Sequence, residues 1–272
     1  IPGAEGKQIL LDVRYNPSRF RQKIVVFAHG YKGFKDWGQW NDVADAFVEQ
    51  GFCFIKFNFS HNGVTSSNLL DITDLESFGR NTYSKELFDI QAVFDWILST
   101  QELPDGVVTK SGLSLIGHSR GGAIAILHAA RDHRVDKLVT WGAVSDFRSR
   151  FPFGLELERW KKEGVFYALN ARTRALLPHY LDFLEDFEQN EERLNIKTAA
   201  KSLVCPHLIV HGNDDEAVHV SDAFKIHRWS GKSRLELVEQ TGHTFGMGYP
   251  LMNAAKQAEL INRTVAFLTQ EI

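Results

Sequence analysis

The stretch LSLIGHSRGG, residues 113–122, constrains the fold of this chain more than any other feature. A short apolar run ends at Gly117, and small residues with helical character begin directly behind Ser119. Residues 117–121 match the pattern G-x-S-x-G, which is typical of a strand that turns at once into a helix. Glycines flank the serine because larger side chains would collide at so tight a turn. The pattern therefore predicts that Ser119 stands on a strained turn at the start of a helix.

A serine in this position is a candidate nucleophile. At the N-terminus of a helix, unpaired N–H groups and the helix dipole favour the negative charge that develops on an attacked carbonyl oxygen. The hydroxyl also needs a base to take its proton, and that base needs an acceptor to orient it. A lone G-x-S-x-G also fits any strand-to-helix turn. The interpretation of Ser119 as a nucleophile therefore depends on a histidine and an acid elsewhere in the chain.

Strand and helix patterns alternate along most of the chain. Residues 24–28 fit a strand buried on both faces, and residues 84–100 carry the apolar stripe of an amphipathic helix. Asp36 is expected to cap another helix, over residues 40–47. Such alternation predicts an α/β fold, a doubly wound and mostly parallel sheet with helices on both faces. The predicted strands are residues 9–13, 24–28, 52–57, 113–116, 137–141, 207–210 and 235–238.

The alternation is interrupted once, between residues 147 and 202. We expect residues 1–146 and 203–272 to form one core, and residues 147–202 to form a cap inserted between the sixth and seventh core strands. The inserted segment contains a predicted hairpin of residues 165–169 and 172–177. The strand before the insertion ends beside Ser119 in such a fold, so we expect the cap to cover the site.

The predicted cap also carries an aromatic stripe, Tyr180, Phe183 and Phe187, which a solvated loop would not need. We predict that Phe166, Tyr167 and Tyr180 bind the substrate; the alternative is that the stripe only anchors a helix to the body. Four arginines of this segment either favour an acidic or polar acyl group or form a solvated face. They are Arg148, Arg150, Arg172 and Arg174.

His243 is the candidate base. It lies in the loop of residues 240–246, after the last predicted strand and before the last predicted helix. The ends of parallel strands open at one edge of the sheet, so this loop is expected on the same side as Ser119. A histidine between Gly242 and Gly246 is seldom a core residue. The remaining alternative is a mobile surface loop.

Several acids are candidates for orienting His243. The turn that leaves the predicted strand 207–210 carries Asp214, Asp215 and Glu216, at the same edge of the sheet. This acidic turn could also simply cap the following helix. Asp146, which follows the strand 137–141, is a rival acid at the same edge.

Taken together, these motifs resemble the α/β-hydrolase superfamily, nearest to its dienelactone-hydrolase-like and esterase or peptidase-like branches. The resemblance rests on the turn at Ser119, the G-x-x-D-x-x-V pattern of residues 212–218, the Gly242-His243 pair and the strand exit His29-Gly30. It covers nearly the whole chain, with the predicted cap as the variable part. In the family's pattern the orienting aspartate falls on Asp215, which favours Asp215 over Asp214 and Asp146.

The resemblance also implies an oxyanion hole and a reaction. One donor would be the backbone N–H of Arg120 and the other that of Tyr31, in the loop after the strand 24–28. His29 and His118 are expected to brace loops. The implied activity is hydrolysis of carboxylic esters through an acyl-enzyme on Ser119, with no metal and no organic cofactor. The alternatives are a peptidase-like amide hydrolase or a non-catalytic protein that binds a small ligand.

The composition is that of an ordinary globular protein. The net charge of −3 and the absence of a basic run argue against a nucleic acid partner, and no apolar stretch is long enough to span a membrane. Cys53 and Cys205 lie in apolar stretches and are expected to be reduced core residues. We expect a cytoplasmic location and a small-molecule ester as partner. The first residue is Ile1, so a removed leader stays open, as does the oligomeric state.

Overall fold

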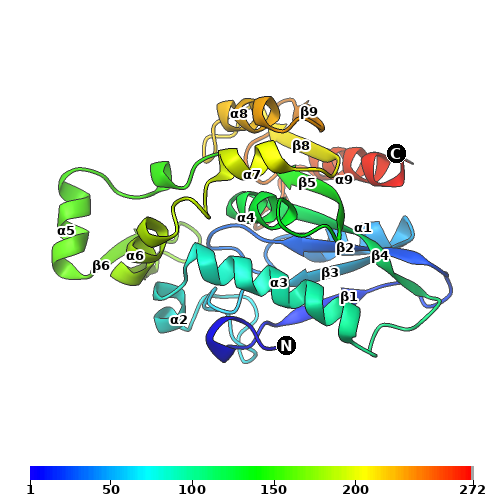
Figure 1. Cartoon of the computed structure of the whole chain (residues 1–272), viewed down its shortest axis with the longest axis horizontal. Coiled ribbons are helices and arrows are strands. Elements are labelled where there is room, and N and C mark those ends of the chain that lie inside the picture. Colours follow the sequence, from blue (N-terminus) through cyan, green and yellow to red (C-terminus); the bar gives the residue numbers. More distant parts are fainter. Residues whose placement is uncertain (271–272) are drawn as a thin grey trace.

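A seven-stranded sheet forms the centre of the fold in the computed structural model, which describes residues 1–270 (Figure 1). The strand order is β1-β3-β2-β4-β5-β8-β9, and every neighbouring pair is parallel except β1 with β3. This arrangement confirms the predicted mostly parallel α/β sheet. The strands are β1 (Leu11–Arg14), β2 (Gln22–Ala28), β3 (Phe52–Phe57), β4 (Val108–His118), β5 (Val135–Trp141), β8 (His207–Gly212) and β9 (Ser233–Val238).

Helices cover both faces of the sheet, as predicted. One apolar cluster joins the sheet to α1 (Trp40–Glu49) and α9 (Ala254–Thr269). A second, larger cluster joins the opposite face to α3 (Tyr83–Ser99), α4 (Arg120–Ala129) and α8 (Ser221–Trp229). The short helix α2 (Leu75–Gly79) begins within the polar loop that follows β3. The sheet between these layers is therefore buried on both faces, which explains its near-continuous apolar strands.

Asp36 does not cap α1. The residue at the N-cap is Gln39, whereas Asp36 forms ion pairs with Lys35 and Lys56. Lys56 lies on β3, is fully buried, and also contacts Asp12 on β1. A buried ammonium group needs counter-charges, and this requirement outweighs the small gain from capping a helix.

The inserted segment leaves the sheet after β5 and returns before β8. These are the fifth and sixth strands of the sheet in chain order, so the predicted place between the sixth and seventh strands was wrong. The predicted strands themselves give the observed place, because 137–141 is the fifth and 207–210 the sixth of the seven predicted ranges. The segment contains a 3-10 turn (Arg148–Arg150), α5 (Leu155–Glu163), β6 (Val165–Leu169), β7 (Leu176–Tyr180), α6 (Leu181–Gln189) and α7 (Ile196–Ser202).

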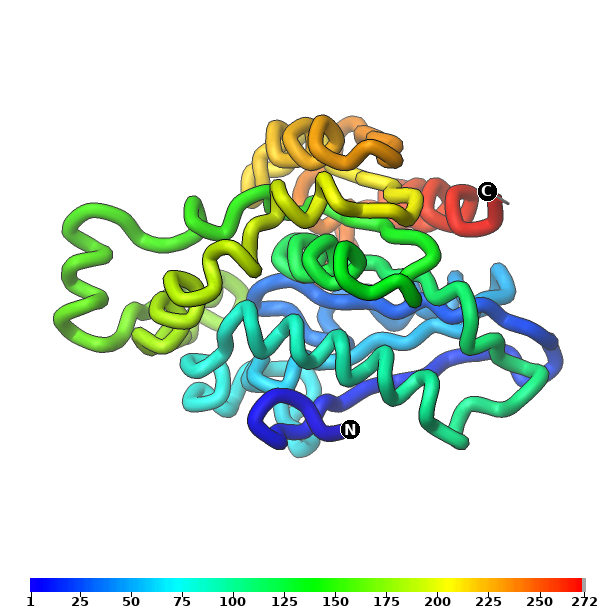
Figure 2. Tube along the Cα trace, in the orientation of Figure 1, coloured from blue at the N-terminus to red at the C-terminus, as the bar shows by residue number. Residues whose placement is uncertain are grey.

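Most of this segment projects away from the sheet, whereas its last helix returns to the body (Figure 2). Helix α7 packs against α4 and α8. The strands β6 and β7 form the antiparallel hairpin that was predicted, but the second strand begins at Leu176 rather than at residue 172. Asn170 holds the intervening residues in a turn, because its backbone bonds to Ala175 and Arg174. The division of the chain into a core and a cap stays a prediction.

No helix among residues 1–270 combines the length and the apolar character needed to cross a membrane.

Candidate active site

Ser119 occupies a strained turn between β4 and α4. Its backbone angles are φ 56° and ψ −121°, outside the regions that L-residues favour, and its N–H donates to the carbonyl of Trp141 at 2.8 Å. The flanking glycines are sterically required. A Cβ atom on Gly117 would lie 2.4 Å from the carbonyl oxygen of Gly121, and one on Gly121 would lie 2.3 Å from that of His29. The local sequence therefore produces the predicted strand-turn-helix.

His243 and Asp215 meet at the same edge of the sheet. The Nδ1 atom of His243 lies 2.7 Å from Oδ2 of Asp215. The other carboxylate oxygen, Oδ1, accepts the backbone N–H groups of Ala217 and Val218 at 2.9 and 2.8 Å. Asp215 is buried, and these bonds fix its orientation. The carboxylate can in turn hold the ring of His243 in one tautomer.

His211 also contacts this carboxylate, which the sequence analysis did not predict. Its Nε2 atom donates to the carbonyl of Val218 at 2.7 Å and lies 3.3 Å from Oδ2 of Asp215. Burial alone would raise the pKa of Asp215. Hydrogen bonds from His211 and His243 outweigh that effect and hold the pKa below its ordinary value. The position of His211, four residues before Asp215 at the end of a strand, was the signal that could have identified it.

The two rival acids lie elsewhere. Asp146 accepts the backbone N–H groups of Arg148 and Ser149 and so caps the turn that follows it. Asp214 is exposed. Within residues 1–270, neither carboxylate forms a hydrogen bond with His243.

Two further histidines lie beside the turn and are held neutral. His118 donates from Nε2 to the carbonyl of His243 at 2.9 Å, and burial lowers the pKa of its ring to about 3. His29 donates to the carbonyl of Gly30 at 2.9 Å, and burial lowers its pKa to about 4. These contacts are those of residues that brace the loops around Ser119.

The predicted oxyanion donors both border Ser119. Gly30 lies against the turn so closely that a Cβ atom there would be 2.8 Å from Cβ of Ser119. This contact places the next residue, Tyr31, beside the serine. The backbone N–H groups of Tyr31 and Arg120 donate to no backbone carbonyl in the described part of the chain. The role of these two N–H groups as an oxyanion hole stays a prediction.

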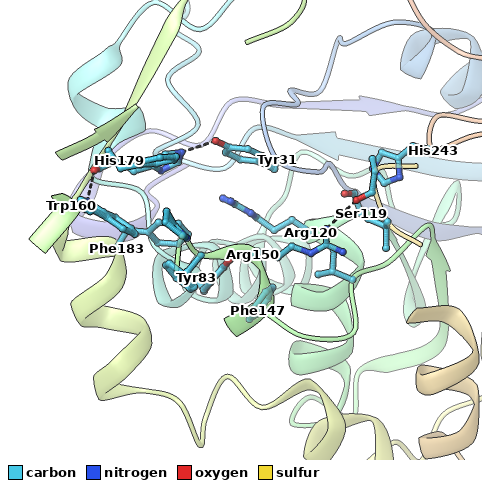
Figure 3. A pocket seen from close by; sticks show the side chains of 16 residues that line it. Tyr31, Tyr83, Ser119, Arg120, Phe147, Arg150, Trp160, His179, Phe183 and His243 are labelled. Carbon is cyan, nitrogen blue, oxygen red and sulfur yellow. Dashed lines mark hydrogen bonds between the residues drawn. The ribbon is translucent and has the colours of Figure 1, made fainter. Parts of the chain in front are cut away.

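A cavity of about 370 Å³ opens from Ser119 and His243 toward the inserted segment (Figure 3). Its walls are mostly aromatic, so it suits an apolar group with a few polar atoms. The aromatic side chains come from the loop after β2, from α3 and from the inserted segment. They are Tyr31, Tyr83, Phe147, Phe151, Trp160, Phe166, His179 and Phe183.

One of the three predicted substrate-binding residues lines this cavity. Phe166 does, whereas Tyr167 is 53% exposed and lies outside it. Tyr180 donates its hydroxyl to Glu76 at 2.7 Å and is not among the lining residues. Successive side chains of a strand point to opposite faces, and Phe166 pairs across the hairpin with His179. The inward residue of β7 is therefore His179, which that alternation could have identified.

Tyr31 and His179 close the cavity on the side away from His243 (Figure 3). The Tyr31 hydroxyl lies 2.6 Å from Nε2 of His179, and Trp160 donates its indole N–H to the carbonyl of His179 at 2.9 Å. Burial lowers the pKa of His179 to about 3, so its ring is neutral near pH 7. Burial likewise raises the pKa of Tyr31 to about 12.

Comparison with known proteins gives a consistent result. Residues 25–257 match the model of the alpha/beta hydrolase family. The serine hydrolase BPHL of Homo sapiens is 29% identical over 149 residues, which are 50% of this chain and 50% of that protein. The match thus spans about half the length of this curated relative.

Solved structures of esterases are similar over nearly the whole chain. Est1E from Butyrivibrio proteoclasticus with ferulic acid bound has a TM-score of 0.71 and 15% identity, covering 98% of this chain and 96% of that chain. The esterase EaEST from Exiguobacterium antarcticum has a TM-score of 0.63 and 18% identity, covering 99% and 98%. At such identities, the likeness establishes a shared fold.

Proposed function

Because the chain belongs to the alpha/beta hydrolase family, we propose that it hydrolyses carboxylic esters through an acyl-enzyme on Ser119. One observation carries the proposal. The strained turn presents Ser119 at the sheet edge where Asp215 holds His243 at 2.7 Å, and an aromatic cavity opens from the same point. A nucleophile, a base and an orienting acid in one place are what acyl transfer needs.

In the proposed reaction, Ser119 Oγ attacks the ester carbonyl while Nε2 of His243 takes the hydroxyl proton. Asp215 accepts the Nδ1–H bond and stabilises the imidazolium that forms. The N–H groups of Tyr31 and Arg120 stabilise the negative charge on the carbonyl oxygen, and loss of such a donor typically costs about 3–4 kcal/mol of activation free energy.

The tetrahedral intermediate then collapses. The bond to the alcohol oxygen breaks, and His243 returns its proton to the leaving alcohol, which gives an ester of Ser119. Water attacks this acyl-enzyme with His243 again as the base, and the acid product leaves with Ser119 restored. Asp215 remains ionised throughout, which agrees with the lowered pKa of its carboxyl group.

We further propose that residues 147–202 act as a cap that selects the acyl group. Phe147, Phe151, Trp160, Phe166 and Phe183 come from this segment and supply much of the cavity wall. Flat aromatic walls favour an aromatic or bulky apolar acyl group. Est1E, which has the same fold, has been solved with the aromatic acid ferulic acid bound, and this likeness supports such a preference.

The test is labelling with a fluorophosphonate, which modifies activated serines, followed by peptide mass spectrometry. Modification is expected at Ser119, with hydrolysis of 4-nitrophenyl acetate lost in proportion to labelling. Modification of another serine would refute the assignment. Labelling of Ser119 together with faster cleavage of amides than of matched esters would instead make the chain an amide hydrolase.

A further inference from the structure

Arg120 contributes more to the cavity than its backbone N–H. Its guanidinium group lies 4.2 Å from the ring centre of Tyr31 and 5.2 Å from that of Tyr83. The side chain runs from the turn into the middle of the cavity, between these rings (Figure 3). It is 12% exposed, and because it lines the cavity, the exposed part faces a bound acyl group.

Two N–H-bearing atoms of Arg120 are free to bind a ligand. Nη1 lies 3.4 Å from Oε1 of Glu86, a long contact. Nε and Nη2 form no hydrogen bond with residues 1–270. Neither atom is fully buried, so both remain accessible from the cavity. These two atoms form one edge of the guanidinium plane, and their parallel N–H bonds match the two oxygens of a carboxylate. Stacking on an aromatic ring leaves that edge open.

Glu86, the carboxylate that faces Arg120, also accepts a hydrogen bond from Asn81 at 2.7 Å. It is 3% exposed and has a second oxygen, Oε2, with no partner among the described residues. Burial raises the pKa of Glu86, and Arg120 opposes that effect. Glu86 contacts Arg120 at Nη1, so Nε and Nη2 keep the capacity to bind a second anion.

The other arginine of the cavity has no such capacity. Arg150 donates to Asp222 at 3.2 Å and to the carbonyl of Ala217 at 3.0 Å, so its guanidinium is bound to the core. Arg148 and Arg172, which the sequence analysis considered for an acidic substrate, form ion pairs with exposed acids and do not line the cavity. Among cavity residues within 1–270, Arg120 is the cation with an open edge.

We propose that Arg120 is a specificity-determining residue which binds a carboxylate on the acyl group, so that the preferred substrates are monoesters of dicarboxylic acids. The inference rests on the proposed ester hydrolysis and names its substrate class. The aromatic walls hold the spacer between the two carbonyl carbons, and the Nε–Nη2 edge of Arg120 holds the free carboxylate. An arginine with a purely structural role would instead direct these donors to protein acceptors, since buried donors without partners are costly.

The experiment compares two pairs of substrates: the mono-4-nitrophenyl esters of terephthalic and adipic acid, and the same esters with the free acid capped as a methyl ester. The wild-type protein is expected to have the higher kcat/KM for at least one acid over its capped partner. R120M removes the charge and is expected to lower that ratio at least tenfold. R120K keeps the charge without the planar fork and is expected to lie between.

E86Q is the matched control because it removes the competing carboxylate and keeps the shape. It is expected to raise the ratio of acid to capped ester, whereas a merely structural pair would change both rates alike. Two results would overturn the proposal. One is a wild-type kcat/KM that is lower for the acid than for the capped ester in both pairs; the other is the same acid-to-capped ratio of kcat/KM in wild type and R120M.

Calorimetry on S119A provides a readout independent of turnover. Adipate and terephthalate are expected to bind more tightly than their dimethyl esters, and equal binding would overturn the proposed role of Arg120. Failure of the proposed hydrolysis is a different result, in which S119A cleaves the capped esters as fast as the wild type. Neither measurement depends on R120M being stable.

Discussion

Nδ1 of His243 lies 2.7 Å from Oδ2 of Asp215, although 28 residues separate them along the chain. The two residues follow neighbouring parallel strands, and the end of β8, Gly212, pairs with the end of β9, Val238. Parallel strands deliver the loops at their carboxyl ends to the same edge of the sheet. The pairing of β8 with β9 therefore decides that this acid and this base meet.

The proposed nucleophile and base should act as a unit. S119A and H243A are each expected to abolish most hydrolysis of 4-nitrophenyl acetate, because neither group is effective without the other. The double variant is expected to lose little more, since the effects of such residues are strongly non-additive. Steady-state kinetics of the three variants tests this, and losses that multiply would contradict it.

Asp215 should orient His243 in a way that no other acid can. D215N is expected to lower kcat by about 10⁴, because an amide in place of the carboxylate favours the wrong tautomer of His243. D146N and D214N are the matched controls, since neither carboxylate bonds to His243. Circular dichroism checks that D215N folds. A larger loss of kcat in D146N than in D215N would assign the acid to the loop after β5.

The hairpin of the inserted segment offers a pair of adjacent residues with opposite exposure. F166A is expected to change the ratio of kcat/KM between aromatic and short acyl esters by about 1–3 kcal/mol per lost contact, because Phe166 lines the cavity. Y167A is the control and is expected to leave that ratio unchanged, because the side chain is largely exposed. Equal ratios in both variants would show that this segment does not select the acyl group.

His207 should make stability fall on acidification. It is fully buried between β5 and α8, and burial lowers the pKa of its ring to about 3, from about 6.5 in the unfolded chain. Between these values the unfolded chain binds a proton that the folded protein does not. The contribution of His207 to the free energy of unfolding is therefore fully present above pH 6.5. It decreases as the pH falls toward 3, by about 1.4 kcal/mol per pH unit.

Urea unfolding between pH 6 and pH 4 measures this slope. H207Q is expected to remove about 1.4 kcal/mol per pH unit from the pH dependence of the unfolding free energy. The exposed His133 provides the control, and H133Q is expected to leave the slope as in the wild type. A slope unaltered in H207Q would contradict the neutral state of the buried ring.

Local patterns in the sequence were sufficient for the fold class and for the turn at Ser119. Apolar runs alternate with amphipathic helices, and this period depends only on neighbouring residues. Likewise, Gly117 and Gly121 mark a turn with no room for a larger residue. A side chain at Gly117 would collide with the backbone of the same turn, and one at Gly121 with the backbone at the end of β2. The place of the loop 240–246 after the last predicted strand indicated His243, and the family resemblance then favoured Asp215, without any knowledge of their contact.

Tertiary structure alone decided which side chains form the cavity and what charges Arg120 faces. The cavity residues come from α3 (Tyr83), α4 (Arg120), the hairpin (His179) and α6 (Phe183). No sequence period relates such distant positions. The same holds for Lys56, whose place in an apolar strand is explained only by the two carboxylates that reach it from other elements. Burial and ion pairing depend on distances between elements, so they are settled when the elements pack and not before.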